Sequence, residues 1–208
     1  MGEIEAAEKN ALPVLIEKKD IRGVFHVHTS FSDGADSLEA MAVAAGKAGF
    51  AYIGVSDHSQ SAFYAGGLKA ADIERQHAMI DALNKKYAPF HIFRGIESDI
   101  TQDGNLDYDD KILAGFDFVI AAVHSHFNMP EEEMTGRICR ALANRHTTML
   151  AHPTGRLPLS REPYAVNMLK VMEAAAQYGK VLELNANPHR FDLDWRNCIV
   201  AGKKGVKI

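Results

Sequence analysis

Histidines and carboxylates occur in this sequence where short apolar runs end. His26 and His28 stand at the end of such a run, residues 22–28, and Asp33 follows within a turn that contains Gly34. Residues two apart on a strand point to the same side, so both imidazoles are expected to face one point. Two imidazoles and a nearby carboxylate are the kinds of ligand that bind divalent metal ions. This stretch therefore predicts a metal site, although an inert pair of histidines is the competing interpretation.

Four further residues of this kind stand at or just after the ends of the next four apolar runs, and they are His58, Glu97, His124 and His152. One tetrahedral site uses about four ligands, so five imidazoles and two carboxylates predict two to three divalent ions. Glu97 is the expected bridge and catalytic carboxylate, because its two oxygens can serve two ions. A ligand set this rich in imidazole favours zinc or manganese over magnesium.

The remaining histidines and two arginines are assigned by their place in the expected elements. Three histidines lie in mid-helix, at the start of a strand and at a helix end, where structural or surface roles are expected: His77, His91 and His146. His126 and His189 follow strand ends closely enough for a loop role near substrate. Arg156 and Arg190 also follow strand-end motifs, and a guanidinium can bind phosphate through two parallel hydrogen bonds. Two ordinary surface arginines are the alternative.

The apolar runs alternate with segments of helical spacing along the chain, which predicts an α/β fold with a parallel sheet. The runs show no alternation of polar and apolar residues, so both faces of the sheet should be buried. An open sheet would spread the strand ends along a line, whereas a barrel gathers them around one mouth. The clustered ligands therefore favour a barrel. We expect residues 1–20 to form a lead-in, residues 21–208 to form the domain, and residues 206–208 to begin a seventh strand that stays incomplete.

Composition sets limits on the partners of the chain. The 208 residues include 47% hydrophobic residues and carry a net charge of −4, so binding of nucleic acid would need a local basic patch. The only cysteines, Cys139 and Cys198, form no disulfide framework, which indicates a cytoplasmic protein. No apolar run is long enough to span a membrane, so no membrane partner is expected.

The same motifs carry a resemblance to a known family. The chain resembles the PHP (polymerase and histidinol phosphatase) family in the order and spacing of five motifs: His26-Val27-His28-Thr29 with Asp33-Gly34, Ser56-Asp57-His58-Ser59, Gly95-Ile96-Glu97, Val123-His124-Ser125 and Ala151-His152-Pro153. It is most similar to the PHP domain at the C-terminus of bacterial family X DNA polymerases, through four further stretches: Asp20-Ile21-Arg22-Gly23, Leu106-Asp107-Tyr108, residues 152–157 and residues 182–188.

The resemblance implies a distorted seven-stranded (β/α) barrel of the TIM-like kind, with a trinuclear metal cluster. Carried over motif by motif, the implied ligands are His26, His28, Asp33, His58, Glu97, His124 and His152. The implied activity is phosphoester hydrolysis, as 3′→5′ exonuclease or related processing of DNA 3′ ends. The family also has an Asp-x-His after its seventh strand, and this sequence has none there. We therefore expect a C-terminally incomplete domain, with a polymerase domain as a partner in a longer parent chain.

The ligands divide into three groups in the expected mechanism. His26 and His28 would serve one ion, His124 and His152 a second, and Asp33 and His58 a third, with Glu97 bridging two of the ions. Arg156, Arg190 and His126 would contact the phosphate-ester substrate, for example a single-stranded DNA 3′ end. Two alternatives are a small-molecule phosphatase of the histidinol-phosphatase type and a non-catalytic structural PHP module.

Overall fold

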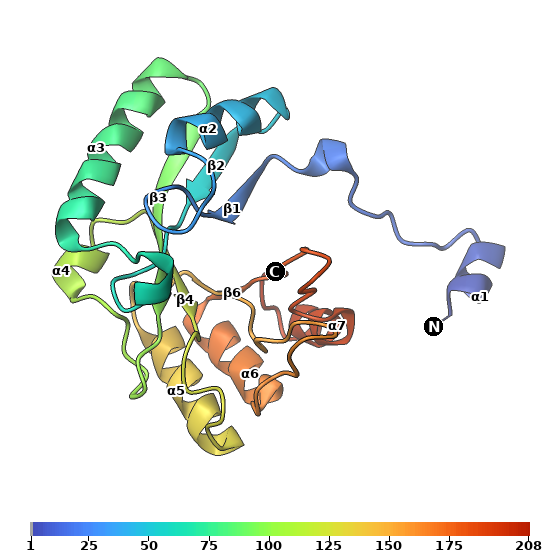
Figure 1. Cartoon of the computed structure of the whole chain (residues 1–208). Coiled ribbons are helices and arrows are strands. Elements are labelled where there is room, and N and C mark those ends of the chain that lie inside the picture. Colours follow the sequence, from blue (N-terminus) through green and yellow to red (C-terminus); the bar gives the residue numbers. More distant parts are fainter. Residues whose placement is uncertain (1) are drawn as a thin grey trace.

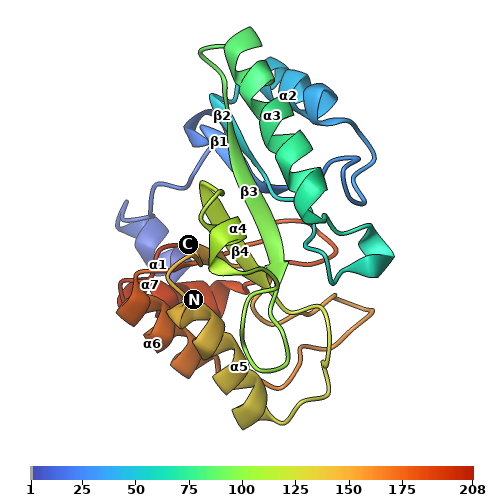
Figure 2. The same cartoon turned by 90° about the vertical axis from the view of Figure 1, so that its left-hand side faces the viewer.

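A curled sheet of parallel strands forms the centre of the molecule. The computed structural model describes residues 2–208, and within them six strands follow one another in sheet order β1-β2-β3-β4-β5-β6. Their bounds are β1 (Gly23–Val27), β2 (Tyr52–Val55), β3 (His91–Asp99), β4 (Phe118–Ala122), β5 (Met149–Leu150) and β6 (Val181–Leu182). The first half of β3 pairs with β2 and its second half with β4, so the sheet steps along this strand and curls (Figures 1 and 2). The result is an α/β, TIM-like half-barrel.

Helices cover the outer side of this sheet (Figure 1). They are α2 (Leu38–Lys47), α3 (Ala70–Lys86), α4 (Asp110–Leu113), α5 (Glu131–Ala143), α6 (Met168–Tyr178) and α7 (Trp195–Lys203), with a short 3₁₀ turn η2 (Phe63–Ala65) after β2. Polar side chains cap the N-termini of several helices. Ser37 accepts a hydrogen bond from the Ala40 amide at the start of α2, and Asp194 accepts two hydrogen bonds at the start of α7. Such caps satisfy the amides that a helix leaves free at its N-terminus.

Two separate hydrophobic clusters hold the layers together. One joins α2 and α3 to β2 through residues such as Leu38, Ile53 and Ile80. The other, larger cluster packs α5 and α6 against β4 and β5 and includes Ile138 and Val171. The periodicity of the sequence predicts these elements because each strand is apolar on both faces and each helix has one apolar stripe.

Aromatic rings fill the concave side of the sheet below the strand ends. The rings of Phe25 and Phe118 meet edge to face, with centroids 4.9 Å apart. This packing requires glycine on two neighbouring strands, because a Cβ at Gly54 would lie 2.2 Å from the Phe25 ring and one at Gly95 would lie 2.1 Å from the Phe118 ring. The rings form a floor under the polar mouth of the half-barrel.

The sheet is open between its first and last strands. An apolar cleft of about 690 Å³ separates β1 from β6 and is lined by Phe25, Leu184 and Ile208, among others. The expected start of a seventh strand is present as a single parallel bridge between Val181 and Lys207, with the Leu182 amide donating to the Lys207 carbonyl at 3.0 Å. Within residues 2–208 the half-barrel therefore has six named strands, against the distorted seven-stranded barrel with an incomplete seventh strand expected from the sequence.

The segment before β1 extends away from the body (Figure 1). It contains α1 (Glu3–Glu8), which has no buried residue, and a 3₁₀ turn η1 (Lys18–Asp20). Both cysteines are free thiols. Across the described part of the chain, every helix is too short or too polar to cross a bilayer.

Candidate metal centre

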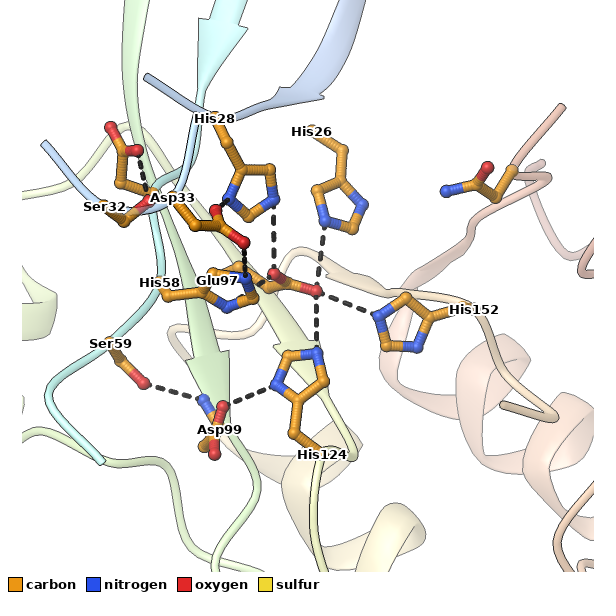
Figure 3. Close-up of polar contacts among 12 residues, drawn as sticks. His26, His28, Ser32, Asp33, His58, Ser59, Glu97, Asp99, His124 and His152 are labelled. Carbon is orange, nitrogen blue, oxygen red and sulfur yellow. Dashed lines mark hydrogen bonds and ion pairs between the residues drawn. The ribbon is translucent and has the colours of Figure 1, made fainter. Parts of the chain in front are cut away.

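Glu97 lies at the centre of the mouth, surrounded by imidazoles (Figure 3). It is 1% exposed and stands near the end of β3, the longest strand of the sheet. A carboxylate oxygen of Glu97 lies 3.0–3.4 Å from one ring nitrogen of each of five histidines, which are His26, His28, His58, His124 and His152. Residues from five successive strand ends thus meet at one side chain, as expected at the mouth of a barrel.

Asp33 extends the group on one side. Its two carboxylate oxygens lie 3.3 Å from His28 Nδ1 and 3.6 Å from His58 Nε2. The turn that brings it there needs Gly34, because a Cβ at that position would lie 2.6 Å from the His28 carbonyl. All seven residues that the sequence nominates as ligands therefore lie together.

The donor atoms form four groups, each with its atoms within 4.8 Å of one another. Three groups contain the nominated residues: His26, His28 and Glu97; His28, Asp33 and His58; Glu97, His124 and His152. The fourth group, His58, Asp99 and His124, adds a carboxylate that sequence reasoning missed.

Several buried atoms in this ring have no hydrogen-bond partner, and they fit metal ligation. They are Glu97 Oε2, His28 Nδ1, His58 Nδ1 and His152 Nδ1. His58 Nδ1 is only 3.0 Å from Glu97 Oε2, but the pair lacks the angles of a hydrogen bond. A buried polar atom left unpaired costs ~1–3 kcal/mol. Bound cations would satisfy Glu97 Oε2 and the lone pairs of His28 Nδ1 and His58 Nδ1, which face Asp33 and Glu97, so the residues present suit divalent metal ions of the kind that histidine binds.

Two further carboxylates hold the imidazoles from behind. Glu183, in the segment after β6, has Oε1 2.6 Å from His26 Nδ1, and its Oε2 accepts the His152 amide at 2.6 Å. Asp99 has Oδ1 2.7 Å from His124 Nδ1 (Figure 3). Such partners fix which nitrogen of a ligand histidine faces the metal. Sequence reasoning missed both, although Glu183 directly follows a strand and Asp99 stands two residues after Glu97 on β3.

A third buried acid, Asp57, holds the loop that carries Asp33. It is 0% exposed and accepts hydrogen bonds from the Thr29 amide and hydroxyl at 2.7 Å, from Ser32 at 2.5 Å and from Gln76 at 2.6 Å. These four donors tie the loop after β1 to the end of β2 and to α3. The position of Asp33 is therefore set by a satisfied network and not by the turn alone.

The backbone brings His26 and His28 together by a different route from the one expected. Strand alternation was the reason given for their shared direction, but His28 lies beyond β1 and His26 has a φ of 64°. The pairing register of β1 shifts between Val24 and Val27. His152 also has a positive φ, 27°. Non-glycine residues held at positive φ are strained, and such strain is concentrated at functional sites.

The carboxylates control the protonation of this ring. Burial opposes a charge on His26, but Glu97 and Glu183 outweigh it and raise the His26 pKa to about 10. Burial likewise opposes a charge on His124, but Asp99 and Glu97 raise the pKa of His124 to about 9. Burial would raise the Glu97 pKa, yet the surrounding imidazoles hold it well below its usual value. Burial lowers the pKa values of His28 and His152. In the metal-free protein the ionised Glu97 is thus paired with the charged His26 and His124, beside imidazoles that burial keeps neutral.

The nominated substrate residues lie in different places. Arg190 lines the same 200 Å³ hollow as Glu97, and its Nη1 is buried without a partner. Arg156 instead donates to the Phe191 carbonyl and lies 3.9 Å from Asp194, so the structure does not bring it to this hollow. His126 lines a neighbouring hollow. Sequence reasoning missed Arg161, which lines a second hollow, of 300 Å³, beside His58, His124 and His152.

The three histidines given structural or surface roles all have partners remote from the ring, and His91 packs edge to face on Phe93 with centroids 4.5 Å apart. His77 packs edge to face on Phe116, with centroids 5.0 Å apart, and His146 lies 3.6 Å from Asp110. Tyr64, which the sequence gave no reason to single out, also borders the 300 Å³ hollow. Burial and then the charges of Asp99 and Glu97 raise its pKa to about 12.

The half-barrel carries at its mouth several groups of histidines and carboxylates that could hold metal ions, as a metal-dependent phosphoesterase requires. Residues 25–187 match the model of the PHP domain, and the chain belongs to the PHP domain family. It is 44% identical to the DNA polymerase/3′-5′ exonuclease PolX of Bacillus subtilis over 194 residues, which cover 93% of this chain and 34% of that protein. The chain thus spans about a third of the length of that relative.

A second sequence relative and a solved structure are also similar to this chain. The chain is 30% identical to a probable phosphatase of Thermoanaerobacter sp. (strain X514), over 88% of this chain and 74% of that protein. The crystal structure of histidinol phosphate phosphatase from Lactococcus lactis, complexed with zinc, L-histidinol and phosphate, matches with a TM-score of 0.61 at 19% identity. That match covers 90% of this chain and 83% of the other, and it supports the TIM-like fold.

Proposed function

We propose that this chain hydrolyses phosphodiester bonds at DNA 3′ ends, as a 3′→5′ exonuclease or a related 3′-end processing activity. The observation that carries the proposal is the single buried carboxylate, Glu97, within 3.4 Å of five imidazoles. The 44% identity to PolX supports DNA as the substrate. A polymerase domain is the partner that this relationship suggests for the chain.

The proposed ligands are His26, His28, Asp33, His58, Glu97, His124 and His152. We assign two to three ions to them, zinc or manganese, since imidazole-rich sites prefer these metals to magnesium. Bound divalent ions would neutralise phosphate oxygens and lower the pKa of a water molecule toward neutrality. Glu97 would be a ligand shared by two ions, and Glu183 and Asp99 would hold His26 and His124 in the orientation that ligation requires.

Arg190 is the proposed phosphate ligand. It lines both hollows beside the ring, and its buried Nη1 is free to donate to a phosphate oxygen. Arg156 and His126 lie outside the hollow of Glu97, so we assign them no contact with the reacting phosphate. The functional unit would comprise residues 21–208, after a lead-in of residues 1–20, of which Met1 lies outside the described residues.

A small-molecule phosphatase is the second candidate function. The hollow beside His58, His124 and His152 has a volume of about 300 Å³, which suits a compact ester as well as one nucleotide. The histidinol phosphate phosphatase fold and the probable phosphatase relatives support this alternative. Release of nucleotides from single-stranded DNA, compared with release of phosphate from small monoesters, separates the two functions. A purely structural module is disfavoured because all seven nominated ligands are present and converge.

Replacement of Glu97 tests the proposal. Glu97→Gln keeps the side-chain volume but removes the charge that faces five imidazoles, so metal content should fall below two ions per chain. Hydrolysis of a 3′-labelled oligonucleotide should fall at least ~10²-fold, as when one electrostatic group of an active site is lost. Glu173→Gln is the matched control, because Glu173 forms an exposed ion pair with Lys204 on the far helices. Unchanged metal content in Glu97→Gln would contradict the bridging role.

A further inference from the structure

Two hollows adjoin at the mouth of the half-barrel and share two side chains. The inner hollow, of about 300 Å³, is bordered by the ring histidines His58, His124 and His152. The outer hollow, of about 830 Å³, lies beside it over the loops after β4 and β5. Phe127 and Arg161 line both, so they stand at the junction between them. A path therefore leads outward from the ring past these two residues.

The junction consists of flat groups stacked on one another. The Arg161 guanidinium carbon lies 4.5 Å from the centre of the Phe127 ring, and the Tyr164 ring stacks on Phe127 at 17°, with centroids 6.2 Å apart. Tyr164 is fixed by a hydrogen bond from its hydroxyl to the Pro153 carbonyl at 2.8 Å. Gly155 makes room for it, because a Cβ there would lie 2.5 Å from the Tyr164 ring. The stack is thus built before any ligand arrives.

The Arg161 guanidinium also brings a positive charge to the junction of the two hollows. Its Nε donates to the Gly155 carbonyl at 2.8 Å, which orients the guanidinium and leaves both Nη groups available. Among residues 2–208, no carboxylate forms an ion pair with it. The exposed Glu162 is the only acidic residue lining the outer hollow, and Arg190 adds a second cation at the inner one. The path therefore presents positive charge on a protein whose net charge is −4.

Aromatic and guanidinium planes interleaved with cations are the recurring means of binding single-stranded nucleic acid without regard to sequence. The inner hollow is sized for one ester group and its nucleoside, whereas the outer one is more than twice as large. A phosphatase acting on small monoesters would have no use for the outer hollow. A strand that continues from the reacting phosphate would run into it.

We propose that Phe127 and Arg161, supported from below by the buried Tyr164, form a stacking subsite for the next base of a single-stranded DNA substrate, with Arg161 contacting the backbone phosphate between the two hollows. This subsite rests on the proposed function, and it makes the enzyme selective for strands over small esters. Because stacking reads no base edge, the preference should be for length and single-strandedness and not for sequence.

The first measurement compares the hydrolysis of two substrates by the full chain loaded with Mn²⁺. The substrates are the p-nitrophenyl ester of thymidine 5′-monophosphate and an oligothymidylate of four nucleotides, and the variants are Phe127→Leu and Arg161→Met. Each variant should lower the ratio of kcat/KM for the oligonucleotide to kcat/KM for the small ester by about 5- to 100-fold, the range expected for losing one stacked base. Arg145→Met, which removes an exposed cation paired with Asp110, should leave both rates unchanged.

Binding of fluorescent oligothymidylate to metal-free protein, followed by anisotropy, decides the subsite independently of catalysis. We expect both variants to bind about 5- to 100-fold more weakly than the wild-type chain and the Arg145 control. Equal binding by variants and wild type would overturn the subsite, even if both substrates are hydrolysed. Weakened binding without hydrolysis of either substrate would support the subsite and refute the proposed function. An unchanged ratio of rates in both variants would also overturn the subsite.

Discussion

Glu183→Gln is the most informative single change in the metal centre, because it alters one atom of a residue with two essential partners. Glu183 Oε1 lies 2.6 Å from His26 Nδ1, and Oε2 accepts the His152 amide at 2.6 Å. A glutamine has only one side-chain oxygen, so it can accept from one of these donors and must present its NH₂ group to the other. Either His26 loses its orienting partner or the His152 amide loses its acceptor.

The magnitude follows from these contacts. A hydrogen bond to a charged group contributes ~1.5–3 kcal/mol, so the free energy of unfolding of metal-free protein should fall by about that amount. Loss of a partner behind a ligand histidine typically weakens metal binding ~10–100-fold. Burial opposes ionisation of Glu183, but the His26 hydrogen bond lowers its pKa, so this stabilisation is present above the ordinary glutamate pKa and is lost as the pH falls through the lowered value.

Urea unfolding of metal-free protein and calorimetric titration with Mn²⁺ measure the two effects separately. Glu173→Gln is the control, because that residue is exposed and its ion pair with Lys204 should contribute less than ~1 kcal/mol. Asp99→Asn should repeat the weakening of metal binding at His124. The reasoning about positioning would be refuted if Glu183→Gln bound metal as tightly as the wild-type chain while its stability fell.

Two other predictions follow from buried charge. Arg137 is 0% exposed and donates to the carbonyls of Ile100, Thr101 and Ser125 in the loops after β3 and β4, so Arg137→Met should lower the free energy of unfolding by at least ~3 kcal/mol, measured by urea unfolding. The pKa values of His26 and His124, about 10 and about 9, mean that both are protonated at pH 7.5 in metal-free protein, so metal binding should release about two protons. Titration calorimetry in buffers of different ionisation enthalpy counts these protons, and the number released should decline as the pH rises through about 9 and about 10. The carboxylates that raise these two pKa values also stabilise the metal-free fold through the protonated imidazoles. This contribution is fully present below about pH 6.5 and is lost as the pH rises through about 9 to 10.

The strand ends could be predicted from sequence because they depend on local signals. An apolar run followed by a polar residue marks the end of a buried parallel strand, and a barrel gathers such ends at one mouth. That reasoning selects Glu97 and the histidines that surround it. The helical spacing of the following residues also predicts α2, whose first turn Ser37 caps by accepting the Ala40 amide.

The rest depends on backbone conformation and on contacts between distant segments, which spacing does not encode. Nothing near His26 announces a φ of 64°, so strand alternation gave a wrong reason for its direction. Glu183 is 157 residues from His26, and only the folded chain pairs them. Arg156 and Arg161 lie in one loop, and the conformation of that loop decides that Arg161 borders the hollow while Arg156 ties down the Phe191 segment.

The stepped pairing of β3 has a consequence for how the molecule opens. Residues 91–94 of this strand pair with β2, and residues 95–99 pair with β4, so one continuous strand connects the two hydrophobic clusters. Without ions, this strand, the Phe31 ring that packs against both clusters and the polar contacts of the mouth are what join the two units, so each cluster can lose its structure as its own cooperative unit. Ions held between Glu97 and imidazoles from both sides would fasten the two units across that strand. With metal bound, the backbone amides of the first and last strands would then exchange their hydrogens at similar rates, through a joint opening of both units. The protein would therefore be most rigid in its metal-loaded form.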